Sequence, residues 1–461
     1  MNATMLPPQP AFPPSDQKVA PPGQEDPHNQ PSLPEVHASV RISRSPQSWR
    51  RLLGFLGPGF MISVGYMDPG NWATDIAGGA RFGYTLLFVI MASNLMAILL
   101  QSLSLKLGIA TEKDLAQQCH QSYGPRVSFV FWFFAEIAIA ACDMAEVIGS
   151  AIALELLFHI PLFWGALITG LDVLLILVLQ RWGLRYVEAL VIVLIGTISA
   201  LFGIQLLLSR PEYGAVFANL VIPSSRIVTN PDMLFIAIGM LGATVMPHNL
   251  YLHSSIVQSR KYERTREGKR EAVKMANIDS ALALTLALFV NAAILVVAAA
   301  VFNRSGHFEV AAIQEAYKLL SPLLGVSGAS TLFAVALLAS GQNSSITGTM
   351  AGQVVMEGFI HLRIAPWKRR LLTRSLAIIP TLVVIAWMGE SGTEKLLILS
   401  QVILSLQLTF AVVPLVMFTG NREKMGELVN GPWLQWGAWC IAVLIAGLNG
   451  WFLILMMQGR V

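Results

Sequence analysis

The stretch Tyr66-Met67-Asp68-Pro69-Gly70-Asn71 stands in the middle of a long apolar run that extends from Leu52 to about Gly79. Proline lacks a backbone N–H and its ring clashes with the preceding turn, so a helix through this run must break near Pro69. Inside a bilayer, unpaired backbone groups are tolerated only where they are buried in protein or line a water-filled cavity. The stretch therefore predicts a broken membrane-spanning helix, with a carboxylate and an amide at the break.

A second interruption of the same kind is Met246-Pro247-His248-Asn249, inside the apolar run from Met233 to Val257. Paired interruptions at corresponding places in the two halves of a membrane protein are the best sequence pointer to a buried binding site between repeats. The two breaks together predict one site formed by two antiparallel broken helices.

The composition is that of a polytopic helical membrane protein. Of the 461 residues, 54% are hydrophobic and only 13% are charged, against roughly 25% charged in an average soluble protein. Many apolar runs exceed the roughly 18 residues that mark a spanning helix. We predict eleven spans, at approximately 52–79, 84–108, 127–158, 162–180, 187–209, 231–258, 275–302, 327–357, 372–389, 394–419 and 433–457.

The basic residues predict how these spans are oriented. When the connections are assigned to alternate sides, 24 of the 31 Lys and Arg residues fall on the side of the N-terminus and 7 on the other. Basic residues concentrate in cytoplasmic loops, so the N-terminus is predicted to be cytoplasmic and the C-terminus to lie outside. The pI near 9.0 follows from these loops and does not indicate nucleic-acid binding.

Two regions of different character divide the chain. Residues 1–50 are rich in Pro, Gln and Ser and lack apolar periodicity, which predicts a disordered cytoplasmic tail. Residues 51–461 form the predicted transmembrane domain: an inverted five-plus-five repeat, with repeat one at about 51–210 and repeat two at about 230–420. An extra helix follows at about 433–457.

The residues at the breaks favour a cation. In both broken spans the first half-helix approaches the centre with its carbonyl end, so both dipoles point negative charge toward the site. Asp68 adds a full negative charge, and Asn71 and the carbonyls near Gly65 and Ala243 add oxygens. The Met246 thioether shifts the preference of such a site from hard cations toward transition metals. His248 adds an imidazole that can ligate or accept a proton.

A second polar group lies on the third predicted span. Glu136, Asp143 and Glu146 are spaced seven and three residues apart, which places them on one helix face. Placing a carboxylate inside a membrane costs free energy, so such residues usually have a function. We interpret these three as a proton path. The alternative is a structural ion pair with an arginine such as Arg369 or Arg370.

Other features of the sequence exclude several classes of site. The three cysteines, Cys119, Cys142 and Cys440, have no close spacing and predict neither a disulfide framework nor a thiolate metal site. There is no HExxH and no GxxxxGK[ST], so neither a zincin site nor ATP-driven transport is predicted. We expect no enzymatic activity, no cofactor, no nucleic-acid partner and no obligate protein partner.

The motifs at 66–71 and 244–253 resemble the signatures of the Nramp family of proton-coupled divalent metal transporters. The resemblance extends from about residue 50 to the C-terminus, through Ser340-Gly341-Gln342-Asn343-Ser344-Ser345 and Leu399-Ser400-Gln401-Val402. It implies a LeuT-like inverted-repeat fold and uptake of Mn²⁺ and Fe²⁺, often with Cd²⁺, Co²⁺ and Zn²⁺, across the plasma (inner) membrane.

The resemblance also implies roles for individual residues. The implied metal ligands are Asp68, Asn71 and Met246, the Gly65 and Ala243 carbonyls, and Gln401 in one state of the cycle. The implied proton path contains Asp68, Glu136, Asp143, Glu146, His248, Arg369 and Arg370. A glycine at position 65 keeps the backbone ligand but is expected to loosen its geometry.

Two other functions stay open on the sequence. One is a magnesium transporter of the same family, which the methionine in the second motif disfavours. The other is a metal receptor that binds without transporting, which would be supported by a large soluble output domain.

Overall fold

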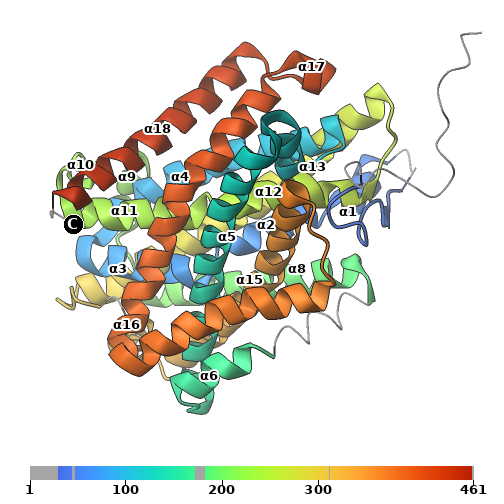
Figure 1. Ribbon diagram of the computed structural model, residues 1–461. Helices are drawn as coiled ribbons and strands as arrows, with labels where there is room; N and C mark the ends of the chain where they lie inside the picture. The colour runs from blue at the N-terminus through green and yellow to red at the C-terminus, as the bar shows by residue number, and fades with distance from the viewer. Residues whose placement is uncertain (1–29, 44–46, 172–181, 311, 459–461) are drawn as a thin grey trace, which may run out of the picture. The chain divides into compact units, whose positions relative to one another are not determined.

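The computed structural model describes residues 30–43, 47–171, 182–310 and 312–458, and within these ranges the protein is built almost entirely of helices (Figure 1). The strands are β1 (Val40–Arg41) and β2 (Arg260–Lys261). The α-helices are α1 (Ser48–Phe55), α2 (Pro58–Gly65), α3 (Pro69–Phe82), α4 (Leu87–Thr111), α5 (Leu115–Phe158), α6 (Leu162–Thr169), α8 (Leu184–Ser209), α9 (Tyr213–Val221), α10 (Arg226–Thr229), α11 (Pro231–Thr244), α12 (Pro247–Ile256), α13 (Arg266–Ala298), α14 (Ile313–Leu324), α15 (Ala329–Ile360), α16 (Pro366–Thr419), α17 (Arg422–Met425) and α18 (Pro432–Met457).

Both predicted helix breaks are present in the structure. Helix α2 ends at Gly65 and α3 begins at Pro69, while α11 ends at Thr244 and α12 begins at Pro247. In each case proline is the first residue of the second half-helix, where its missing N–H costs nothing and its fixed φ suits the helix. The prolines therefore set where each span divides into two halves.

Eight helices in the described part of the chain are long and apolar enough to cross a membrane. The sequence predicts eleven spans, and the difference of three comes from three segments. One long element, Pro69–Thr111, joins the second half-helix of the first predicted span to the second predicted span. The predicted span 162–180 continues from α6 into residues 172–181, outside the described ranges. Helix α15 is not among the eight, and its polar run 340–345 is enclosed by protein.

The predicted spans 372–389 and 394–419 form one bent element, α16. The bend is at Gly389, whose φ of 60° is readily accessible to glycine but costly for other residues. Figure 1 shows the two arms of α16 in orange, meeting at a sharp angle. The bend lets one continuous segment serve as two spans.

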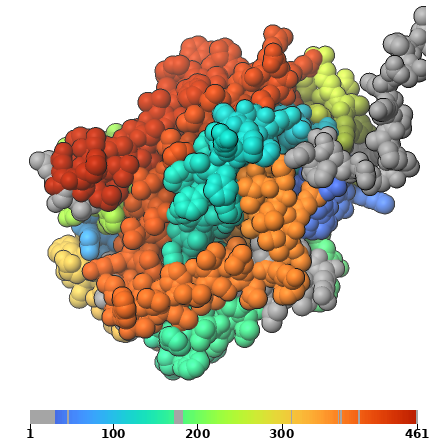
Figure 2. Space-filling view, viewed as in Figure 1, coloured from blue at the N-terminus to red at the C-terminus, as the bar shows by residue number. Residues whose placement is uncertain are grey.

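The broken helices are enclosed by the longer ones. Every residue of α2 and of α12 is buried. Helix α5 packs along both α15 and α16, and in Figure 2 the teal surface of α5 and the orange surface of α16 cover much of the visible face. Backbone groups freed at the two breaks are thus surrounded by protein, as the low dielectric of a membrane requires.

Residues 31–42, which we call the N-terminal strap, correct part of the predicted disordered tail. The Leu33 side chain is only 2% exposed, and its backbone N–H donates to Glu357 Oε2 at 3.1 Å. Farther along, Ala38 N donates to Gln258 O at 3.0 Å, and β1 pairs in parallel with β2. The composition of the tail is that of a disordered segment, but one leucine and a short backbone ladder dock this part onto α15 and onto residues 258–261, which follow α12. Residues 1–29 lie outside the described ranges.

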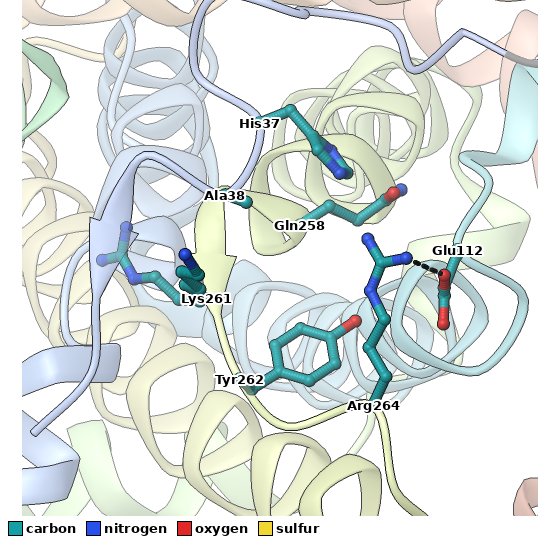
Figure 3. Close-up of a pocket in the computed structure, with 8 residues that line it drawn as sticks. His37, Ala38, Glu112, Gln258, Lys261, Tyr262 and Arg264 are labelled. Atoms are coloured by element: carbon teal, nitrogen blue, oxygen red, sulfur yellow. Dashed lines mark ion pairs between the residues drawn. The ribbon is translucent and has the colours of Figure 1, made fainter. Parts of the chain in front are cut away.

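The strap also forms one wall of a pocket of about 350 Å³ (Figure 3). His37 and Ala38 of the strap face Gln258, Tyr262 and the ion pair between Arg264 and Glu112. Burial lowers the pKa of His37, and the nearby Arg264 guanidinium lowers it further. The Glu112 carboxylate acts in the opposite direction and raises the pKa of His37.

Replacing the buried leucine should release the strap without unfolding the helices. Leu33→Ala removes a core side chain, a change that typically costs about 2–5 kcal/mol, and the short β1–β2 ladder is too small to offset it. Hydrogen exchange measured by mass spectrometry should become faster in peptides that cover residues 31–42 and stay unchanged in α4. The control is Leu53→Ala, because Leu53 is 52% exposed. Equal protection of the strap in both variants would show that Leu33 does not hold it.

Candidate functional site

Asp68 caps the N-terminus of α3 from within the first break. Its side-chain Oδ1 accepts a hydrogen bond from the backbone N–H of Asn71 at 2.8 Å. Aspartate is among the best capping residues, and its charge also suits the positive end of a helix dipole. The cap fixes this carboxylate, which is fully buried, at the point where α2 stops and α3 starts.

The side chain of Asn71 lies where oxygens from both broken helices meet. Its Nδ2 donates to Asp68 Oδ1 at 2.7 Å. The same nitrogen lies 3.2 Å from Gly65 O, at the end of α2, and 3.1 Å from Ala243 O, near the end of α11. The carbonyl ends of the two half-helices thus converge with a carboxylate, as the sequence predicts. Three oxygens directed at one point form an environment for a positive charge.

Met246 borders this cluster of oxygens on the α12 side. A Cβ added at Gly65 would lie 3.1 Å from Met246 Sδ and 2.4 Å from Asn249 Nδ2. The Asn249 amide in turn lies 3.7 Å from that sulfur. A side chain at position 65 would therefore require the end of the Asn249 side chain to move. The expectation that glycine loosens the geometry of this ligand stays a prediction.

Gln401 approaches the first break from α16. Its side chain lies so close to Gly70 that a Cβ there would overlap the Gln401 amide. Its Nε2 donates to Ser400 Oγ at 3.0 Å, whereas its buried Oε1 has no hydrogen-bond partner. Gln401 thus lies beside the Asp68–Asn71 turn, and its Oε1 is available as an acceptor. All six residues predicted as metal ligands lie at or beside the two breaks.

Neighbouring helices hold the broken segment in place. Asn291 on α13 donates from Nδ2 to Tyr66 O at 2.8 Å, and the same nitrogen lies 3.5 Å from Asn71 Oδ1. On the other side, Ser340 of α15 donates to Met67 O, which also accepts from Trp72 Nε1 at 3.1 Å. The free carbonyls between α2 and α3 therefore have partners, which explains how an irregular turn is stable at this depth.

Asp143 and Glu146 form a buried ionic cluster with Arg374, an arginine that was not named from the sequence. Arg374 Nη1 lies 3.3 Å from Glu146 Oε2 and 3.9 Å from Asp143 Oδ1. The side chains of Arg369 and Arg370 lie outside the described part of the structure. Arg374 follows them by about one helical turn, a difference that depends on how α16 is rotated against α5. All three clustered side chains are at most 5% exposed.

The other two residues predicted for the proton path lie in different surroundings. Glu136 is partly exposed and accepts a hydrogen bond from Trp132 Nε1 at 3.0 Å. His248 is buried in α12, and its Nδ1 has no hydrogen-bond partner. A buried imidazole nitrogen without a partner can accept a proton or bind a ligand, so a role for His248 stays a prediction.

Cys142 is a site residue that the sequence reasoning missed. Its Sγ lies 3.8 Å from Asp68 Oδ2 and 3.8 Å from Glu146 Oε1, between the break and the ionic cluster. Its spacing to the other cysteines gave no indication of this. The signal was its place on α5, next to Asp143 and one turn before Glu146, on the polar face of the helix.

The comparison with protein families decides what kind of protein has this site. The family model for natural resistance-associated macrophage protein-like proteins, called Nramp, matches residues 59–455. The chain belongs to the Nramp family. The match includes both broken helices and every residue of the clusters at Asp68 and Arg374.

Curated relatives in the family have a transport function. A divalent metal cation transporter, MntH, of a Nostoc species is 60% identical over 433 residues, 94% of this chain and 98% of the relative. The MntH protein of Listeria innocua is 59% identical over 421 residues, 91% of this chain and 94% of the relative.

Solved structures support the same assignment and establish the fold. The manganese transporter of Eremococcus coleocola superposes with a TM-score of 0.85 at 43% identity, covering 91% of this chain and 90% of that one. Mhp1, a transporter of the nucleobase-cation-symport-1 family, and MhsT each superpose with a TM-score of 0.58, at 15% and 14% identity. At that distance they show the fold alone, which is the LeuT-like inverted repeat.

The ionic cluster gives a stability prediction. Arg374→Gln removes the buried cation that lies 3.3 Å from Glu146, and breaking a buried ion pair from one side typically costs about 3–5 kcal/mol. Thermal unfolding of the purified protein in detergent, followed by tryptophan fluorescence, should show a lower midpoint. Adding Glu146→Gln should recover part of the loss. The exposed Arg226 gives the control, Arg226→Gln, and a midpoint for Arg374→Gln equal to this control would contradict the cluster.

Proposed function

We propose that this protein moves divalent transition metal ions, chiefly Mn²⁺ and Fe²⁺, across a membrane together with protons by alternating access. The observation that supports this most directly is the position of Asn71 Nδ2, which is surrounded by Asp68 Oδ1, Gly65 O and Ala243 O. An N–H donor occupies the point toward which three oxygens are directed, and a cation suits the same point.

Binding of the ion then requires one local change. The Asn71 amide turns by about half a rotation, which withdraws Nδ2 from the oxygens and presents Oδ1 to the ion. The site would then offer a carboxylate, two backbone carbonyls and an amide oxygen, a set that suits hard cations. The Met246 thioether adds a soft ligand, and Gln401 supplies its unpaired Oε1 when α16 closes on the turn.

The proton pathway follows from the cluster beside the site. Asp143, Glu146 and Arg374 lie on the far side of Cys142 from Asp68. A divalent ion at Asp68 repels positive charge nearby, so protons on Asp68 and the cluster are favoured to leave when the ion arrives. Glu136, His248, Arg369 and Arg370 extend this pathway toward the two sides of the membrane.

The proposed setting is the plasma (inner) membrane, with a cytoplasmic N-terminus and an external C-terminus. The metal is substrate and not cofactor, and Cd²⁺, Co²⁺ and Zn²⁺ are further substrates that the sulfur ligand would accept. The bilayer, metal ions and protons are the partners that this function needs. The proposal is supported by relatives that are a divalent metal cation transporter and a manganese transporter.

Two alternatives make different predictions in one experiment. A magnesium transporter of the same family would move Mg²⁺ in preference to Mn²⁺, and a receptor would bind metal without accumulating it. Purified protein in liposomes, with Mn²⁺ outside and an inward proton gradient imposed or omitted, separates the three. Mn²⁺ accumulation that rises with the gradient supports the proposal.

Asp68→Ala should abolish Mn²⁺ binding and uptake, because it removes the carboxylate from a site whose other ligands are neutral. Binding is measured by isothermal titration calorimetry and uptake in proteoliposomes. The control is Asp232→Ala, since Asp232 is exposed in the first turn of α11. The mutant protein should remain folded, because losing the cap of α3 typically costs only about 0.5–2 kcal/mol. Uptake at the wild-type rate in Asp68→Ala would refute the site.

Met246→Ala should relax discrimination between soft and hard ions. The thioether poorly replaces water around Ca²⁺ but binds Mn²⁺ or Cd²⁺ acceptably, and the smaller side chain leaves room for a water molecule. Millimolar Ca²⁺ should therefore compete with Mn²⁺ uptake in the mutant. Met233→Ala is a matched control, because Met233 is buried in α11 away from the break. If Ca²⁺ is excluded as well as in the wild type, Met246 does not set selectivity.

A further inference from the structure

The thiol of Cys142 lies at the metal site although the sequence gave it no role. The residue is on α5 and only 1% exposed. Its sulfur is 3.8 Å from Asp68 Oδ2, the carboxylate oxygen that takes no part in capping α3. Asp68 Oδ1 is occupied by Asn71, whereas the thiol is the neighbour of Oδ2. The carboxylate oxygen that does not cap the helix, Oδ2, therefore faces the Cys142 sulfur.

A second sulfur is in the same place. Cys142 and Met246 pack in one buried cluster with Leu404 of α16. Thiolate and thioether sulfur are the ligands by which proteins select soft metal ions. The thiol beside Asp68 and the thioether of Met246, the residue that precedes α12, thus belong to one buried cluster.

The spacing suits two ligands of one ion. In zinc sites the metal lies about 2.3 Å from a thiolate and about 2.1 Å from a carboxylate oxygen, which puts the two ligand atoms about 3.6 Å apart at the tetrahedral angle. The observed separation of 3.8 Å between Cys142 Sγ and Asp68 Oδ2 is close to this value. An ion can bridge the two atoms with little movement of either helix.

An independent observation also points to a ligand here. Gln401 is fully buried, and its Oε1 has no partner. It lies one turn before Leu404 on α16, which belongs to the same buried cluster as Cys142 and Met246. The Gln401 side chain is next to Gly70 at the break, and a cation bound there would satisfy this amide oxygen.

We propose that Cys142 is a ligand of the transport site for soft divalent ions, Cd²⁺ and Zn²⁺, together with Asp68 Oδ2 and Met246 Sδ. The proposal rests on the metal-transport function proposed above and concerns the choice among metals. Metals bind the thiolate, so coordination releases the thiol proton. Glu146, 3.8 Å from Sγ, passes this proton into the proposed proton pathway, so that it leaves the site as the metal ion enters, like the protons of Asp68 and the cluster.

Because harder ions depend less on a sulfur ligand, removing the cysteine should change the ratio of the Cd²⁺ affinity to the Mn²⁺ affinity. Cys142→Ser should lower the affinity for Cd²⁺ relative to that for Mn²⁺ by about tenfold or more, since oxygen replaces the soft ligand. The experiment uses the full chain in detergent and measures both affinities by isothermal titration calorimetry. Cd²⁺ bound to wild type should also give an ultraviolet charge-transfer absorption of the cadmium–thiolate bond, which Cys142→Ser should lack.

The chain offers a matched control on the same helix. Cys119 is buried in α5 outside the metal site, and Cys440 is exposed on α18. Cys119→Ser and Cys440→Ser should keep the cadmium–thiolate absorption and the wild-type affinity ratio. Cys142→Ala is a second variant, with the same expected result, should the serine form not be monodisperse on size exclusion.

Retention of the absorption and of the Cd²⁺ to Mn²⁺ ratio in Cys142→Ser would overturn this proposal. Failure of wild type to bind or accumulate Mn²⁺ would instead overturn the proposed function, so the two failures are distinguishable. Loss of the absorption in Cys119→Ser but not in Cys142→Ser would assign the cadmium–thiolate bond to the wrong end of α5, and would also refute the proposal.

Discussion

The interaction on which the rest of the structure depends is the convergence of two helix ends on one side-chain amide. Proline breaks leave the Gly65 and Ala243 carbonyls without intrahelical donors, in a part of the protein that water does not reach freely. Asn71 satisfies both, together with the carboxylate that caps its own helix. The surrounding helices then serve to enclose this point, which is why α2 and α12 are buried along their whole length.

Helix α5 links that point to a second polar region. It presents Cys142 to the carboxylate at the break and, one residue and one turn later, Asp143 and Glu146 to Arg374. Carboxylates in a low dielectric are strongly coupled to nearby charge. Two charged groups on either side of one thiol are therefore within reach of each other's fields, and this gives a physical basis for coupling between a metal ion and protons.

How much could be predicted from the sequence depended on the range of the interaction. The breaks at Pro69 and Pro247 follow from covalent structure, because proline acts locally. The class of helical membrane protein followed from hydropathy, and the LeuT-like fold from the resemblance to the Nramp family. Three features could not be reached this way: the choice of Arg374 depends on helix rotation, the role of Cys142 on the packing of α5 beside α3, and the docking of the strap on one buried leucine. The space around Gly65 depends likewise on Asn249, far along the chain.

The amide of Asn71 has a consequence for the part of a transport cycle in which no cargo is bound. A carrier that has released its ion must still change conformation. Carbonyl groups that face each other without hydrogen-bond donors would raise the free energy of that change. Here each oxygen around the Asn71 amide has an N–H donor when no ion is bound. The empty form therefore avoids this cost when it changes conformation. The same hydrogen bonds compete with an incoming ion and lower the affinity for it. Rotation of the Asn71 amide thus favours rapid return of the empty carrier over tight binding of the ion.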